Sequence, residues 1–196
     1  MYKIIGLLLL ILLIKDGYCG TNRTYLIKKD LISGLKGGEF TVYDTTGKNA
    51  LFRMESKPGV LHNVRLFDGL TKKNPIALLK AKLSVVLYKG TIAILNKKLN
   101  QWQNGTINQN YKIVGNKFLL SYNNVDISME GKAASLDTTF IDQSNQQVLA
   151  KFHKRVSSLF WRNKYDIQIL SDKFPDQIYF LGVAARDHTN KKIHSG

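Results

Sequence analysis

Cationic side chains at alternate positions are the residues of this chain whose types and spacing point most directly to chemistry. Lys151, His153 and Arg155 stand two residues apart in one segment, and Lys80 and Lys82 do so in another. Because alternate residues of a β-strand lie on the same face, each set would present a row of positive charge. Such a row binds phosphate or sulfate groups through charge-assisted hydrogen bonds. These five residues are candidate contacts for an anionic ligand; the alternative is that they are ordinary outward polar residues of a sheet.

A second group of candidates surrounds Trp102. An indole that follows Lys97 and Lys98 suits the headgroup region of a bilayer, so Trp102 is a membrane-interface candidate. Two sequons for N-linked glycosylation are present, one at Asn22 and one at Asn104. A sugar on Asn104, two residues from the indole, would hinder insertion of Trp102 into a membrane.

Catalytic motifs are missing from the sequence. It contains no nucleophile elbow, phosphate loop or dinucleotide fingerprint, and its four histidines form no metal-spaced pair. Asp172 and Asp176 are four residues apart, but roles at the start of a helix explain them without general acid–base chemistry. We therefore predict that the protein is not an enzyme, that no residue is catalytic, and that it uses no metal or cofactor.

The net charge of +15 indicates the class of partner. The chain has 29 basic and 14 acidic residues, and residues 1–19 hold two lysines and one aspartate, so the rest carries +14. This excess favours acidic partners such as anionic lipid headgroups, acidic polysaccharide or nucleic acid. The basic residues occur as scattered pairs rather than as a long arm, so we expect no specific nucleic-acid binding. The alternative is a solvated surface whose charge is incidental.

The first 19 residues have the form of a secretory signal peptide. A short basic start precedes an apolar run at residues 4–14, and small residues follow at 17, 19 and 20. Eleven residues are too few to span a bilayer as a helix, which takes about 20. We expect cleavage after Cys19, the only cysteine, and a location outside the cell or in the lumen of the secretory pathway. The weaker alternative is an uncleaved anchor at residues 4–14; residues 20–196 form a single domain in either case.

Three similar segments predict β-hairpins. Each has a hydrophobic pair, an aspartate, a polar turn and a second alternating strand, and the aspartates are Asp44, Asp68 and Asp142. An aspartate that opens a type I turn accepts a hydrogen bond from its own backbone two residues on. Gly47 and Asn145 stand three residues after their aspartates, where a bulged turn requires a positive φ. Turn formation therefore accounts for these carboxylates.

Two-residue periodicity dominates between residues 24 and 170 and predicts ten to twelve strands, a spacing typical of a sandwich or barrel. Residues 99–110 are rich in asparagine and glutamine and suggest a long exposed loop. After Asp176, the eight residues 178–185 are apolar without interruption, which predicts a helix buried on all sides. Arg186, Asp187 and His188 are expected to end this helix and return the chain to solvent. The inside of a closed sheet is the natural place for such a helix.

These features together resemble the tubby C-terminal-like superfamily, most closely its LURP-one-related branch, with the phospholipid scramblases as relatives. The resemblance is carried by residues 40–48 and 51–54, and by residues 165–170 leading into residues 176–187. It extends over nearly all of residues 24–190. It implies an α+β fold that is mostly antiparallel β, a closed barrel of roughly 12 strands around a buried hydrophobic C-terminal helix. It also implies binding rather than catalysis, since tubby proteins bind phosphoinositides through basic residues on the barrel.

The sequence therefore predicts a secreted, non-enzymatic barrel that contacts an acidic lipid headgroup or another polyanion through a basic face. Peripheral contact with a membrane is compatible with this function. One alternative is a structural or protein-interaction module whose charge is incidental. Another is scramblase-like lipid transport, if residues 4–14 remain as an anchor.

Overall fold

The computed structural model describes residues 22–30, 38–58, 61–69, 73–83, 87–111, 115–132, 135–156 and 163–193. The expected signal peptide at residues 1–19 and the alternative anchor at residues 4–14 lie outside these residues.

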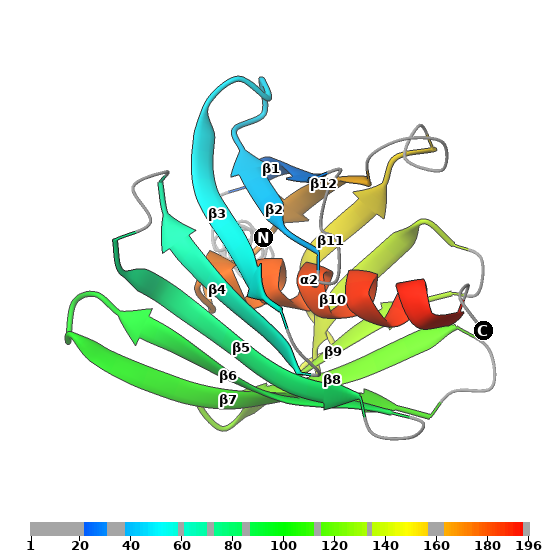
Figure 1. Ribbon diagram of the computed structural model, residues 1–196. Coiled ribbons are helices and arrows are strands. Elements are labelled where there is room, and N and C mark those ends of the chain that lie inside the picture. Colours follow the sequence, from blue (N-terminus) through cyan, green and yellow to red (C-terminus); the bar gives the residue numbers. More distant parts are fainter. Residues whose placement is uncertain are drawn as a thin grey trace, which may run out of the picture.

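The described residues form a closed antiparallel barrel of twelve strands and one long helix, α2 (Asp176–Ile193) (Figure 1). Each strand pairs with its neighbour in the chain, and β1 closes the barrel against β12. The strands are β1 (Arg23–Lys29), β2 (Phe40–Tyr43), β3 (Ala50–Lys57), β4 (His62–Asp68), β5 (Pro75–Leu83), β6 (Tyr88–Asn96), β7 (Gln101–Asn110), β8 (Asn116–Tyr122), β9 (Val125–Gly131), β10 (Asp137–Asp142), β11 (Val148–Lys154) and β12 (Lys164–Ile169). The expected α+β fold, a twelve-stranded closed barrel around a C-terminal helix, is confirmed.

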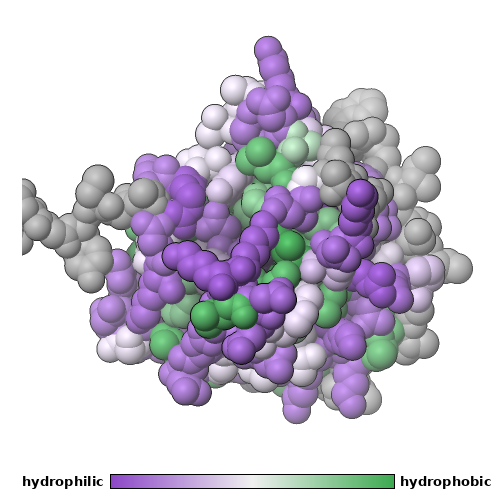
Figure 2. Space-filling model, turned by 90° about the vertical axis from the view of Figure 1, so that its left-hand side faces the viewer, coloured by the Kyte–Doolittle hydropathy of each residue, from purple (hydrophilic) through white to green (hydrophobic). Residues whose placement is uncertain are grey.

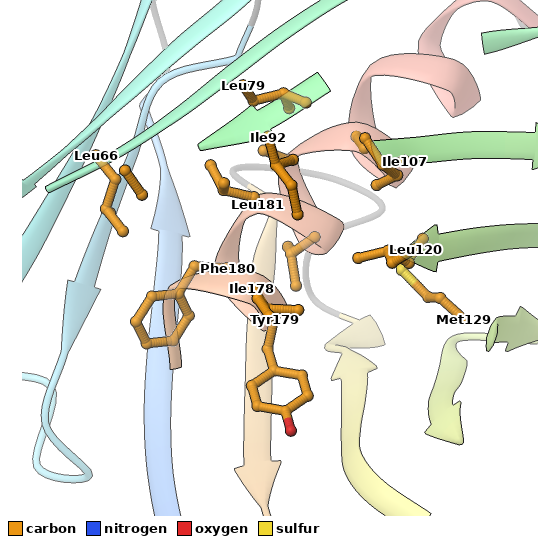
Figure 3. Packing of buried hydrophobic residues seen from close by; sticks show 14 of the residues in the cluster. Leu66, Leu79, Ile92, Ile107, Leu120, Met129, Ile178, Tyr179, Phe180 and Leu181 are labelled. Carbon is orange, nitrogen blue, oxygen red and sulfur yellow. The ribbon is translucent and has the colours of Figure 1, made fainter. Parts of the chain in front are cut away.

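Helix α2 lies inside the barrel and supplies the centre of the core (Figure 1). Its side chains lie among inward-facing residues of β4 to β9, including Leu66, Ile107 and Leu120 (Figure 3). A β-carbon on Gly182 would come within 2.8 Å of the Phe140 ring, so this close approach of helix and wall requires glycine. Each large side chain buried here, such as Phe180, contributes about 1.5–3 kcal/mol to folding.

The expectation that residues 186–188 end the helix was wrong. Helix α2 continues to Ile193, and Arg186 and Asp187 remain only 8% and 4% exposed. The physical reason is that the barrel supplies partners for both charges. Arg186 donates to the backbone oxygens of Ser135 at 3.2 Å and Asp137 at 3.3 Å, so its charge does not need solvent.

Asp187 is held by a buried cluster of donors. Its carboxylate forms an ion pair with Lys29 of β1 and accepts hydrogen bonds from the Tyr165 hydroxyl at 2.6 Å and the Asn163 amide at 2.7 Å. Burial alone would raise the pKa of Asp187, but the Lys29 charge and these hydrogen bonds lower it below its ordinary value. The cluster therefore joins the last turns of α2 to β1 and β12.

A buried histidine lies at the same end of the barrel. His62 of β4 is 3% exposed, its Nδ1 is 2.8 Å from the Tyr88 hydroxyl, and its ring stacks on His188 with centroids 4.0 Å apart. Burial, followed by the proximity of His188, lowers the pKa of His62 from 6.5 to about 3. His62 is therefore neutral in the folded protein at neutral pH.

Two of the aspartate turns can be compared directly. In the first, the Gly47 N–H donates to the Asp44 carbonyl at 3.0 Å, and Gly47 has the expected φ of 69°. In the third, the positive φ of 61° falls on Gln146, so the expectation for Asn145 was wrong. The reason is that the Gln146 N–H closes the turn onto the Asp142 carbonyl at 2.8 Å, which makes this turn one residue longer.

Residues 99–110 were expected to form a loop, but most of them form β7, which pairs with β6 over residues 101–108 and with β8 over residues 105–110. Ile107 is buried in the core, while Gln101, Trp102, Asn104 and Asn110 are exposed. The two glutamines on the face of Ile107 accept hydrogen bonds, Gln103 from the Tyr122 hydroxyl at 2.7 Å and Gln109 from the Tyr88 N–H at 3.2 Å, so the strand tolerates this polar composition.

We predict that replacing Asp187 by Asn lowers the free energy of unfolding by about 3–5 kcal/mol, because the buried Lys29 ammonium then lacks its counter-charge. Asp68→Asn is the matched control. It breaks the exposed Lys97–Asp68 pair and should cost no more than about 1 kcal/mol. Urea unfolding measures both, and equal effects would show that the buried pair does not stabilise the barrel.

We also predict that stability falls as the pH drops below 6.5. The pKa of His62 is lower in the folded than in the unfolded protein, so the unfolded state binds more protons between pH 6.5 and about 3. One such group makes the free energy of unfolding fall by about 1.4 kcal/mol per pH unit in this window. Urea unfolding at several pH values should show a shallower slope for His62→Phe, and an unchanged slope would contradict the assignment.

Candidate functional site

The first cationic row lies on β11 and its flank, and neighbouring carboxylates engage two of its three members. His153 Nδ1 lies 2.7 Å from the Asp137 carboxylate on β10. Arg155 donates two hydrogen bonds of 2.7 Å to the Asp166 carboxylate on β12. Those bonds raise the pKa of Arg155 further above its ordinary value. Of the three, only Lys151 has no ion pair with any residue that the structure describes.

The two candidate lysines on β5 have different surroundings from the residues on β11. Lys80 and Lys82 are exposed on the outer face of β5, while Leu79 and Ala81, which alternate with them, are buried. Lys82 stands directly opposite Lys89 of β6, a residue that sequence analysis did not single out. Like charges placed opposite each other across two strands destabilise a sheet. None of the described carboxylates forms an ion pair with any of these three lysines.

The three lysines border a hollow on the outer wall of β5, β6 and β7, which we call the outer groove. Its side chains form three rows across the strands. We call them the cationic row, which has two lysines, the hydroxyl row, which has two threonines beside Lys80, and the apolar row, which ends in one amide. The rows are Lys82–Lys89–Asn108, Lys80–Thr91–Thr106 and Leu78–Ala93–Asn104.

The outer groove consists of two adjoining depressions that share Lys80, Thr91 and Thr106. One has a volume of about 570 Å³ and reaches the Asn104 row; the other, of about 390 Å³, reaches the Lys82 row and Leu61. Both volumes lie in the range of small-molecule sites. The floor is low because the outward side chains of Thr91, Ala93 and Thr106 are short. Gly105 serves the other face of the sheet, where it lets β7 approach β8. A β-carbon at Gly105 would lie 2.4 Å from the Ser121 carbonyl oxygen.

Trp102 lies on β7, on the same outer face as Asn104 and two residues away from it. Its side chain is 43% exposed, and Leu99 in the preceding turn is 60% exposed. Lys97 in this turn pairs with Asp68, while Lys98 is exposed. The β6–β7 turn lies at the end of the barrel where α2 begins, and hydrophobic side chains at that end lie among hydrophilic ones (Figure 2).

Asp172 and Asp176 belong to a network of ion pairs and hydrogen bonds at the end of the barrel where α2 begins. Arg23 forms ion pairs with Asp172 and Asp176, and its Nη2 lies 2.8 Å from Asp176. The Tyr25 hydroxyl donates to Asp176 at 2.7 Å, and burial together with this bond raises the pKa of Tyr25 to about 12. This network ties β1 to the first turn of α2, so the two carboxylates serve the fold.

The two sequons lie in different places. Asn104 is exposed and lines the outer groove, together with Gly105 and Thr106. Asn22 is exposed just before β1, which pairs with β12 and β2. Glycosylation at both positions stays a prediction.

Metal-binding groups and membrane-spanning helices can be assessed for the residues that the structure describes. Among those residues, no three His, Cys, Asp or Glu side chains are grouped as a metal site. No helix in the same part of the chain combines the length and apolarity that a bilayer crossing requires.

Comparison with known proteins identifies one relationship. A family model described as LURP-one-related matches residues 23–184, which include all twelve strands and half of α2. Neither a curated protein nor a solved structure matches the chain.

The Lys82–Lys89 pair generates a prediction about charge. Lys89→Glu should raise the free energy of unfolding by about 0.5 kcal/mol at low salt, because a repulsive cross-strand pair becomes attractive. The gain should shrink in 1 M salt, where exposed charges are screened. Lys151→Glu is the control, since Lys151 stands opposite Thr139 and Gln168. Urea unfolding at both salt concentrations measures the effect, and a loss of stability in Lys89→Glu alone would contradict the pairing.

Proposed function

The chain belongs to the LURP-one-related family, a branch of the tubby-like superfamily, and from this membership we propose that it is a non-enzymatic binding domain for acidic lipid headgroups. The ligand site is the outer groove. The observation that carries the proposal is the concentration of Lys80, Lys82 and Lys89 around one hollow without carboxylate partners among the described residues.

The electrostatics of the outer groove favour an anion. Lys82 and Lys89 repel each other in the unliganded protein, and a phosphate between them would replace this repulsion with two charge-assisted hydrogen bonds. Thr91 and Thr106 place hydroxyl groups beside Lys80, so neutral donors are available for the remaining phosphate or headgroup oxygens. The net charge of +14 that remains without residues 1–19 adds long-range attraction toward an acidic surface.

The same side of the barrel suits a membrane surface. Leu61 is 46% exposed beside the cationic row, and Leu99 and Trp102 are exposed near the other end of β6 and β7. A barrel lying with this wall on a bilayer would place lysines at the headgroups and apolar side chains at both ends of the contact. Lysine stems and an indole are adapted to this interface because each combines an apolar body with a polar tip.

The proposed location follows from residues 1–19 rather than from the barrel. A cleaved signal peptide would deliver the domain to the secretory lumen or the exterior, where it would contact the acidic lipids of that side of the membrane. In the same compartment Asn22 and Asn104 would be available for glycosylation.

We predict that the triple substitution Lys80→Gln, Lys82→Gln and Lys89→Gln weakens binding to vesicles containing acidic lipid roughly a hundredfold. Each lysine near an anionic surface contributes about 1 kcal/mol. Vesicle sedimentation measures binding, with neutral vesicles as the reference. The matched control is Lys48→Gln, Lys132→Gln and Lys151→Gln, which removes the same charge from exposed lysines elsewhere.

Three results would argue against this function. Equal losses in the two triple variants would show that only overall charge matters. Equal binding to neutral and acidic vesicles, or no binding, would exclude acidic headgroups as the ligand. Binding to a soluble sulfated polysaccharide with no binding to acidic vesicles would assign the groove to a free polyanion.

A further inference from the structure

One glycosylation sequon lies inside the outer groove. All three of its residues, Asn104, Gly105 and Thr106, line the larger depression, together with Lys80 and Thr91. Asn104 is exposed on the outer face of β7, whereas Gly105 lies close to Ile92 and the Ser121 backbone. A sugar attached to Asn104 would therefore start in the groove.

The surroundings of Asn104 suit a sugar. Ala93 stands opposite Asn104 on β6, and Leu78 stands opposite Ala93 on β5, so the floor beside the amide is apolar. Thr91 and Thr106 in the next row offer hydroxyl groups. A pyranose ring has an apolar face, which suits the row of Leu78 and Ala93, and polar hydroxyl groups at its rim, which suit the row of Thr91 and Thr106.

We propose that an N-linked glycan on Asn104 closes the outer groove to anionic headgroups. This inference rests on the proposed function, since it makes occupancy of the sequon a control on that same site. The cationic row ends at Asn108, four residues and about 13 Å along β7 from Asn104. The first few sugar rings span this distance, cross the hydroxyl row and cover Lys82 and Lys89.

The attachment is the ordinary transfer from a lipid-linked oligosaccharide pyrophosphate. The Asn104 side-chain nitrogen bonds to the anomeric carbon, the bond from that carbon to the pyrophosphate oxygen breaks, and the amide proton leaves with the lipid pyrophosphate. The transfer takes place before the chain folds, so the exposed acceptor strand is accessible. The protein is therefore made as two populations. Molecules with a glycan on Asn104 have a closed groove, and molecules without it have an open groove.

Asn22 provides the matched control. It is exposed just before β1, and β1 is separated from β5 by β2, β3 and β4. A glycan there adds similar mass and hydration but does not start in the outer groove. Any general effect of glycosylation on vesicle binding should thus be shared by the two sites, whereas closure of the groove is specific to Asn104.

The experiment compares the mature protein that eukaryotic cells secrete from the full chain with a protein of the same residues made in bacteria, which carries no N-linked glycans. Mass spectrometry of glycopeptides reports occupancy of each sequon. Sedimentation with vesicles containing acidic lipid reports binding for the wild type, Asn104→Gln and Asn22→Gln. We expect secreted wild type and secreted Asn22→Gln to bind at least tenfold more weakly than the bacterial protein, and secreted Asn104→Gln to bind like the bacterial protein.

The outcomes separate the two proposals. No binding by the bacterial protein would overturn the proposed function and the closure with it. Equal binding by bacterial and secreted wild type, with Asn104 glycosylated, would overturn the closure alone. An unmodified Asn104 in the secreted protein would also overturn the closure alone. Recovery of binding in Asn22→Gln rather than in Asn104→Gln would place the control at the other sequon and reject this one.

Discussion

The rest of this structure depends on the burial of helix α2. Residues 178–185 are apolar on every side, so the helix is stable only where protein surrounds it completely. A closed sheet provides this enclosure, and its inward positions are filled by the side chains that contact the helix. The interior is thereby committed to packing. Recognition of a partner is left to the outer wall and to the two ends of the barrel.

Charged residues hold the helix at both ends, and they do so by pairing with strands at the barrel seam. Arg23 of β1 pairs with Asp176 in the first turn, and Lys29 at the other end of the same strand pairs with Asp187. Strand β1 thus contacts both ends of α2 while it closes the barrel against β12. Removing one partner of the inner pair leaves an uncompensated charge in a medium of low polarity, which is why that pair links barrel closure to helix placement.

The outer wall divides its charges unequally. On the side of β10, β11 and β12, Asp137 and Asp166 engage His153 and Arg155. On the side of β5 and β6, Lys80, Lys82 and Lys89 gather around a hollow instead. The positive charge is therefore greater on the β5–β6 wall, which lacks such carboxylate partners among the described residues, than on the β10–β12 wall. The proposed binding to acidic headgroups, and its control by a sugar on Asn104, both depend on that distribution.

The sequence by itself determined the class of fold, because strand alternation, turn aspartates and an all-apolar helix are local patterns. It also placed Lys80 and Lys82 on one face, since two-residue spacing is a property of any strand. Only the tertiary structure decided which charges meet. Lys89 faces Lys82 through the register of β5 and β6, and the partners of Arg155 and Asp187 come from segments 11 and 158 residues away. Register and barrel closure are set by the packing of the whole chain, so the length of α2, the strand at residues 101–110 and the composition of the outer groove could not be read from local spacing.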